Sequence, residues 1–431
     1  MLLIFCVLCI ALITFSLMAY DKKKINPITL LIVPWLAMVI GYNMKFVLYY
    51  DLNVNTYIVV IIALGLFSFG TVLGANLHCV EIRFKYKEII VNIEQYKKIF
   101  KKYIIFFSVV GSIPSVLALG NIVNRFGLTF YNQIATIYAQ RINGQYIVER
   151  IPYVGSLLYI AIILAGIYVA KYGLTILVLL PIAGAIIQTF SYGTRQGLLE
   201  VILLFIIPVI SSKFIKLQRK DKINQQKKKG KFGYVLLVIS IVCFFIFVTN
   251  QRSSYVNSSV YSGSKYLSER FRAIVAKHPS LFQLYTYFTS PIGVLNEYLK
   301  KPTYSFGANT LFPFYNLFNK FGINIEVQRY QDFYNIPIHV NVGTVLRELI
   351  QDYTIVPAMV IVFILGISVG LSYVKYTDNQ NIKNTFRYSM LTMLILLSVF
   401  MWFLRDANLI IALVVGLIVS ERLDSYIIEV S

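Results

Sequence analysis

Residues 355–374 read IVPAMVIVFILGISVGLSYV, an apolar stretch without a charged side chain. An α-helix needs about 20 such residues to cross the ~30 Å hydrocarbon core of a membrane. Comparable runs recur along the chain, so the sequence predicts an all-α polytopic integral membrane protein with about 11 transmembrane helices, within a range of about 10 to 12. The predicted spans are 2–20, 27–44, 57–77, 103–119, 153–170, 173–190, 197–212, 232–249, 355–374, 388–404 and 407–420.

The composition indicates the same class of protein. Hydrophobic residues make up 58% of the 431 positions and charged residues 14%, and the mean hydropathy is +0.69. Soluble domains contain about 45–50% apolar and about 25% charged residues. These values exclude a water-soluble enzyme, a disordered chain and a disulfide-rich scaffold. The four cysteines form no CxxC-type pattern and no cluster of ligating residues has useful spacing, so we expect no metal and no cofactor.

The basic residues predict which side of the membrane each connection occupies. Lys and Arg crowd three connections: residues 21–26, residues 78–102 with seven of them, and residues 213–231 with nine. The predicted spans place all three on one face, which is cytoplasmic by the positive-inside rule. Most of the net charge of +21 follows from this topology, so we expect no nucleic-acid partner.

Two longer connections then lie outside, at 120–152 and 250–354, within one transmembrane domain that covers residues 1–431. The connection 250–354 has 105 residues and must be structured. Its Thr289-Ser290-Pro291 is typical of a helix start and predicts a helix over Ile292–Leu299. We expect this large, partly helical extracytoplasmic loop to pack on the membrane surface and to cover a cavity.

Arginine and lysine are distributed differently between the two faces. Ten of the 14 arginines fall outside, against six of the 26 lysines. The planar guanidinium group binds phosphate through two hydrogen bonds, so the outer arginines predict an anionic ligand on that face. Ordinary salt bridges and contacts with lipid headgroups are the alternative for each single arginine. The candidates are Arg141, Arg195, Arg252, Arg270, Arg272 and Arg347.

Arg195 has the clearest setting among these arginines. It lies in Ser191–Gly197, a very short outer turn between two predicted spans, at the height of the lipid phosphates. The helix that begins there offers free N–H groups and the positive end of its dipole. An anion site is one interpretation, and an arginine that extends to the lipid headgroups is the other.

Groups that could activate a hydroxyl are few on the outer face. His339 is the first candidate, because a neutral imidazole accepts a proton near neutral pH; a purely structural histidine is the alternative. Asp352, together with Asp332 and Glu348, supplies the carboxylate candidates. Glu200, inside a predicted span, is either a functional intramembrane acid or the partner of a Tyr or Asn on a neighbouring helix.

Three stretches resemble the Wzy-type polymerases, which join lipid-linked oligosaccharide repeat units of O-antigen or capsule. The first is Gly193-Thr194-Arg195-Gln196-Gly197 at the outer start of a span. The second runs from Tyr287 through Leu299 and continues in Gly307-Ala308-Asn309-Thr310. The third is Asn341–Arg347 with Asp352, leading into the next span. The resemblance covers most of the chain in architecture, and its motifs are moderately specific when taken together.

This resemblance implies an architecture like that of the GT-C glycosyltransferases and an enzyme in the bacterial cytoplasmic (inner) membrane. Its reaction would join undecaprenyl-pyrophosphate-linked units into an O-antigen, capsule or exopolysaccharide on the outer face. The implied partners are the lipid-linked glycan substrates, membrane lipids, and the flippase and chain-length regulator of the same pathway. From the resemblance, substrate binding carries over to Arg195 and Arg347. Substrate contacts by Arg141, Arg252, Arg270 and Arg272, and catalysis by His339 and Asp352, are predicted from the residue types and their outer positions.

Three other functions fit parts of the pattern. A flippase or transporter of lipid-linked sugars usually lacks one large outer domain, so the 105-residue loop counts against it. A glycan ligase would use similar arginines with a different acceptor. A binding or scaffold protein in the membrane is disfavoured by the clustered outer arginines. No P-loop or Rossmann glycine pattern is present, which excludes ATP-driven transport within this chain.

Overall fold

The computed structural model describes residues 1–20, 25–77, 93–142, 151, 153–193, 196–218, 246, 248, 265–323, 325 and 331–429. Within these residues the fold is all-α apart from one two-stranded hairpin. The chain divides into two compact units. Unit 1 comprises Met1–Arg83, Ser259–Lys375 and Leu394–Ala407, and unit 2 comprises Phe84–Ser258, Tyr376–Met393 and Asn408–Ser431.

Unit 1 combines long apolar helices with the shorter elements of the predicted outer loop. Its α2 contacts α1, α3 and α12, and α12 also contacts α11, α14 and β1. The elements are α1 (Leu2–Ala19), α2 (Pro27–Asn43), α3 (Val54–Leu77), α11 (Glu269–Lys277), α12 (Pro279–Lys300), α13 (Phe312–Lys320), β1 (Tyr334–Asn335), β2 (His339–Val340), α14 (Val345–Tyr353), most of α15 (Ile355–Asp378), η5 (Leu397–Val399) and η6 (Phe403–Arg405).

The start of α2 follows from its sequence. The Asn26 side chain accepts a hydrogen bond from the Thr29 N–H at 3.0 Å, and the Thr29 hydroxyl oxygen accepts one from the Asn26 N–H at 3.2 Å. Pro27 occupies the first helical position, where its missing N–H costs nothing. This reciprocal cap satisfies two backbone donors of the helix terminus and fixes where the apolar run becomes helical.

Glycines allow α3 and α15 to approach closely at two successive helical turns. A Cβ atom at Gly70 would lie 2.4 Å from the Phe363 carbonyl oxygen, and one at Gly74 would lie 2.1 Å from that of Ile367. On α15, a Cβ at Gly370 would lie 2.0 Å from the Thr71 carbonyl oxygen. Small residues spaced four apart are typical of helix pairs in membranes, where backbone contact replaces the missing hydrophobic driving force.

The connection between α2 and α3 packs on α12. The Asn296 side chain accepts hydrogen bonds from the Asn53 N–H at 2.7 Å and from the Thr56 hydroxyl at 2.8 Å. The Thr289 hydroxyl lies 3.0 Å from the Tyr49 hydroxyl. These contacts correct the expected start of this helix: α12 begins at Pro279, and Pro291 lies inside it. A proline at position 279 and continuous packing on α2 extend the helix beyond the cap expected at Thr289.

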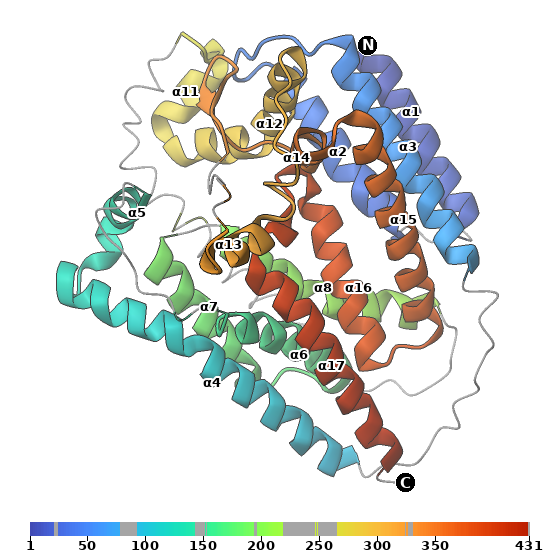
Figure 1. Ribbon diagram of the computed structural model, residues 1–431, viewed down its shortest axis with the longest axis vertical. Coiled ribbons are helices and arrows are strands. Elements are labelled where there is room, and N and C mark those ends of the chain that lie inside the picture. Colours follow the sequence, from blue (N-terminus) through green and yellow to red (C-terminus); the bar gives the residue numbers. More distant parts are fainter. Residues whose placement is uncertain are drawn as a thin grey trace. The chain divides into compact units, whose positions relative to one another are not determined.

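Unit 2 is a helical bundle around a helix that is buried along its length. Residues 158–169 of α6 are all buried, and α6 contacts α4, α7 and α8. The α4, α6, α7 and α8 ribbons lie side by side in Figure 1. The elements are α4 (Ile93–Phe126), η2 (Phe130–Gln133), α5 (Ile134–Ile142), α6 (Ser156–Tyr172), η3 (Ile176–Val178), α7 (Leu179–Tyr192), α8 (Gln196–Gln218) and most of α16 (Ile382–Leu396) and α17 (Ala407–Glu429).

Four helices among the described residues are long and apolar enough to cross a membrane, and they indicate a membrane protein. They are Leu2–Ala19, Val54–Leu77, Glu94–Phe126 and Ile355–Asp378. Shorter apolar helices occupy Pro27–Asn43, Ser156–Tyr172, Ile176–Tyr192 and Gly197–Ser211. The predicted span 388–404 is helical only to Leu396 and continues as η5. The predicted span 232–249 and the basic connection 213–231 lie wholly or mostly outside the described residues.

Candidate functional site

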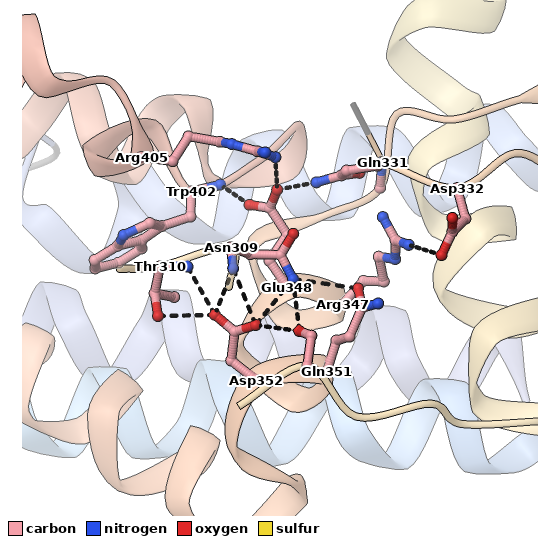
Figure 2. Close-up of polar contacts among 12 residues, drawn as sticks. Asn309, Thr310, Gln331, Asp332, Arg347, Glu348, Gln351, Asp352, Trp402 and Arg405 are labelled. Atoms are coloured by element: carbon pink, nitrogen blue, oxygen red, sulfur yellow. Dashed lines mark hydrogen bonds and ion pairs between the residues drawn. The ribbon is translucent and has the colours of Figure 1, made fainter. Parts of the chain in front are cut away.

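The short helix α14 carries three buried charged side chains. The Thr344 hydroxyl oxygen accepts a hydrogen bond from the Arg347 N–H at 3.3 Å and thereby caps the helix. Arg347 and Glu348 are fully buried, and Asp352 is 2% exposed. Figure 2 shows that each of the three has its own set of neighbours. We call these three residues and their contacts the α14 cluster.

Asp352 holds the loop that precedes α13. Its carboxylate accepts hydrogen bonds from the Ser305 hydroxyl at 2.6 Å, the Asn309 side-chain amide at 2.9 Å, and the Thr310 N–H and hydroxyl at 2.7 and 2.8 Å. The Asn309 N–H lies 3.2 Å from both oxygens. A carboxylate with so many donors is well suited to fix a loop. The catalytic role predicted for Asp352 stays a prediction, and these contacts favour a structural one.

Glu348 joins α14 to the segment that follows α16. Its Oε1 accepts a hydrogen bond from the Arg405 guanidinium at 2.8 Å, and its carboxylate also accepts bonds from the Trp402 N–H and the Gln331 amide (Figure 2). Burial raises the pKa of the Glu348 carboxyl, while Arg405, the Trp402 N–H and Arg347 oppose that rise. The N–H groups of Phe400 and Met401 donate to the Leu397 carbonyl, and Trp402, which follows them outside any helix, directs its N–H to Glu348.

The Arg347 guanidinium group has N–H groups without an acceptor in the described part of the chain. Its guanidinium lies 5.9 Å from the centre of the Tyr298 ring and 5.3 Å from that of Tyr334. Its Nη2 lies 4.0 Å from a carboxylate oxygen of Asp332, whose side chain is 52% exposed. Within the described part of the chain, Nε and Nη1 are buried and have no hydrogen-bond partner. A buried donor without an acceptor costs free energy, so a ligand that supplies acceptor oxygens would bind favourably at this guanidinium group.

His339 lies on the hairpin that leads towards α14. Strands β1 and β2 pair antiparallel with Asn335 opposite His339, and a cis peptide bond joins Ile336 to Pro337. The His339 side chain is exposed, and its ring stacks on Phe333 with 4.6 Å between ring centres. An imidazole in this position is accessible to a ligand, so its predicted role in catalysis stays a prediction.

The other predicted arginines are placed as follows. Arg195 and Arg252 lie outside the described residues, and Arg141 lies in α5, where its side chain is not described. On α11, Arg270 is exposed, and Arg272 donates a hydrogen bond to the Leu267 carbonyl at 3.3 Å. Of the six predicted arginines, the structure places Arg347 in the α14 cluster.

Glu200, the acid inside a predicted span, has a tyrosine partner. The Tyr159 hydroxyl donates a hydrogen bond to Glu200 at 2.9 Å, which is the tyrosine pairing expected as the alternative to a functional role.

Arg405 is a largely buried cation that the sequence does not identify as a candidate, because Arg405-Asp406 reads as a tight turn between two spans. Its position directly after an apolar run gave no signal of a partner 57 positions earlier.

Among the described residues, no group of three or more His, Cys, Asp or Glu side chains could hold a metal ion. The arrangement instead offers a partly satisfied buried cation beside two aromatic rings, which suits an anionic group. Comparisons of the chain with models of protein families, with curated proteins and with solved structures gave no match.

Proposed function

We propose that this chain is a membrane-bound glycosyltransferase of the Wzy type. It joins oligosaccharide repeat units carried on undecaprenyl pyrophosphate into a surface polysaccharide, at the outer face of the bacterial cytoplasmic membrane. The observation that carries the proposal is Arg347, a fully buried guanidinium whose Nε and Nη1 have no hydrogen-bond partner within the described part of the chain. A pyrophosphate supplies acceptor oxygens with the geometry that a guanidinium binds best.

The proposed reaction forms one glycosidic bond and breaks the bond between the donor sugar and its pyrophosphate. The terminal hydroxyl of one lipid-linked unit attacks the anomeric carbon of the growing glycan. The bond between that carbon and the pyrophosphate oxygen breaks, and undecaprenyl pyrophosphate leaves with its electron pair. The proton of the hydroxyl passes to a base, for which His339 is the proposed group. Negative charge grows on the pyrophosphate, so a preorganised cation stabilises the transition state more than the bound substrate.

The surroundings of Arg347 support this assignment. Asp332, at 4.0 Å, is too distant for a good hydrogen bond and is half exposed, so it leaves the guanidinium available for a stronger anion. The rings of Tyr298 and Tyr334 flank the same group and limit access of water.

Arg141, Arg195, Arg252, Arg270 and Arg272 remain proposed substrate contacts. The proposal includes a multi-pass topology of about 11 spans and a GT-C-like architecture.

The chain length of the surface glycan in a deletion strain tests the proposal. Loss of a polymerase leaves glycan with a single repeat unit. Accumulation of lipid-linked repeats in the cytoplasm would indicate a flippase, and full-length polymer that is not attached to its acceptor would indicate a ligase. Either of the last two results would overturn the proposal.

Variants of Arg347 then test the site itself. Complementation with Arg347→Lys, which keeps the charge but loses the planar fork, should restore little polymer. Each lost charge-assisted hydrogen bond is worth roughly 1.5–3 kcal/mol, or about ten- to hundredfold in rate. Lys301→Ala removes one positive charge from an exposed position after α12 and should restore full chain length. Native-length polymer from a normally expressed Arg347→Lys variant would remove Arg347 from the pyrophosphate site.

A further inference from the structure

Helix α13 presents its apolar side chains on one exposed face. Residues 311–321 read LFPFYNLFNKF, and none of the nine residues of α13 is buried. The exposed apolar positions are spaced three or four apart, so they share one side of the helix. Their exposed fractions are 38% for Leu311, 47% for Phe314, 39% for Leu317, 41% for Phe318 and 75% for Phe321. We call these five residues the α13 apolar face.

The opposite side of α13 holds the helix in a fixed orientation. The Tyr315 hydroxyl donates a hydrogen bond to the carbonyl of Phe306 at 2.6 Å. The Asn319 amide donates to the Ile325 carbonyl at 2.8 Å, and its oxygen accepts from the Ile325 N–H at 2.6 Å. The polar groups of Tyr315 and Asn319 therefore bind the protein, while the side chains of the α13 apolar face are exposed. This is the reverse of the pattern of a helix on a soluble protein.

The amino end of α13 is tied to a candidate membrane span. Thr310, two residues before α13, donates two hydrogen bonds to Asp352, and the candidate span α15 begins at Ile355. The Phe312 ring lies 5.4 Å below the Arg405 guanidinium, which in turn binds Glu348 of α14. The amino end of α13 is thus held beside the last turn of α14, directly before the chain enters α15.

We infer that α13 is an interfacial helix, whose apolar face lies in the membrane leaflet where α15 begins; that this leaflet is the outer one rests on the proposed topology. A face of five large apolar side chains is costly to leave in water and marks a lipid or protein contact. Its short tether to the start of the candidate span α15 favours lipid as the occupant, because the end of a span is where headgroups meet acyl chains. Helices of this type lie in the membrane plane with the apolar face about 5–10 Å deep.

Spin labels at neighbouring positions of the full chain test this inference. The four native cysteines are replaced by alanine, and single cysteines are introduced as Leu317→Cys or Phe321→Cys on the apolar face. Lys320→Cys is the matched control, exposed on the same helix but off that face. Each protein is labelled with a nitroxide and reconstituted into vesicles of phosphatidylethanolamine and phosphatidylglycerol. Collision rates are measured with oxygen, which partitions into membranes, and with a nickel chelate, which stays in water.

We expect several-fold fewer collisions with the nickel chelate, and more with oxygen, at 317 and 321 than at 320. Equal nickel accessibility at all three positions would place the face in water and overturn the inference. Low accessibility to both reagents at 317 and 321 would mean that protein covers the face, from a second copy or from another part of the chain, and would also overturn it. Two label positions keep the test valid if one of them disturbs α13. The measurement requires no glycan, so the inference and the proposed function can fail separately.

Discussion

The carboxylate of Glu348 and the guanidinium of Arg405 form a buried ion pair with 2.8 Å between Oε1 and Nη1. Their side chains are 0% and 10% exposed, and 57 positions of sequence separate them. Glu348 belongs to α14 and Arg405 to η6, so the pair fastens the segment after α16 to the helix that carries Arg347. Because Arg347 directly precedes Glu348 in α14, this contact contributes to the position of the backbone that carries its guanidinium.

Single and double substitutions should show that the two charges depend on each other. Glu348→Gln or Arg405→Met removes one partner of a buried ion pair, which costs about 3–5 kcal/mol in comparable cases. The double variant should cost clearly less than the sum, because the first substitution already removes the interaction between the two charges. The measurement is thermal unfolding of the four purified proteins in the same detergent. Additive effects would show that the pair makes no specific contribution.

The pH dependence of stability should report the Glu348 carboxyl. Burial raises its pKa in the folded protein above the unfolded value, so the folded protein binds more protons between these two values. The contribution of this group to stability is therefore present below the unfolded pKa and is lost as pH rises through the folded pKa. Glu348→Gln does not titrate, so its unfolding temperature relative to the parent should increase as pH rises above about 4.3. A constant difference across pH 4–8 would contradict the raised pKa.

Asp352→Asn should destabilise the loop over 305–310. One amide oxygen cannot replace two carboxylate oxygens, and the Asn side chain would direct its NH2 group at the donors of Thr310 or Asn309. Each buried donor left without an acceptor costs about 1–3 kcal/mol. Hydrogen exchange measured by mass spectrometry should become faster over 305–312, and activity should fall together with stability. Loss of activity with unchanged exchange would instead support the catalytic role predicted from the sequence.

His339 gives a contrasting prediction, because its side chain is exposed and makes a stacking contact with Phe333. If it accepts the proton of the attacking hydroxyl, His339→Gln should lower polymerisation with little change in unfolding temperature. The loss should appear in the turnover rate and not in the affinity for the lipid-linked acceptor. Phe333→Leu, which removes the stacking partner, is the matched control. A His339→Gln variant with the parent's rate would exclude the imidazole from the reaction.

The sequence predicted the helices better than it predicted the polar contacts of the site. Helix positions follow from local apolar runs and caps such as Asn26-Pro27, and ten of the eleven predicted spans coincide at least partly with described helices. Arg347 and Asp352 were identified because their types and positions suggested chemistry. The roles of Glu348 and Arg405 depend on a contact across 57 positions, and no local pattern encodes such a contact. For the same reason, the sequence could not separate a loop-holding Asp352 from a catalytic one.

The glycines of α3 provide a test of the fold with an internal control. A Cβ at Gly74 would lie 2.1 Å from the Ile367 carbonyl oxygen, whereas a Cβ at Gly65 of the same helix would meet no atom within 4 Å. Gly65→Ala should therefore stabilise the protein by about 0.5–1 kcal/mol, since alanine favours the helix and restricts the unfolded chain. Gly74→Ala forces the α3 and α15 backbones apart and should destabilise it by about 1–3 kcal/mol.

Thermal unfolding of the two variants in one detergent gives the sign of each effect, which is a stronger test than either magnitude. Gly370→Ala, on the facing side of α15, should resemble Gly74→Ala, because its Cβ would lie 2.0 Å from the Thr71 carbonyl oxygen. Combining Gly74→Ala with Gly370→Ala should cost less than the sum, since a helix pair already separated by one methyl group accommodates the second more easily. If Gly74→Ala proved as stable as Gly65→Ala, the close contact between α3 and α15 would be wrong.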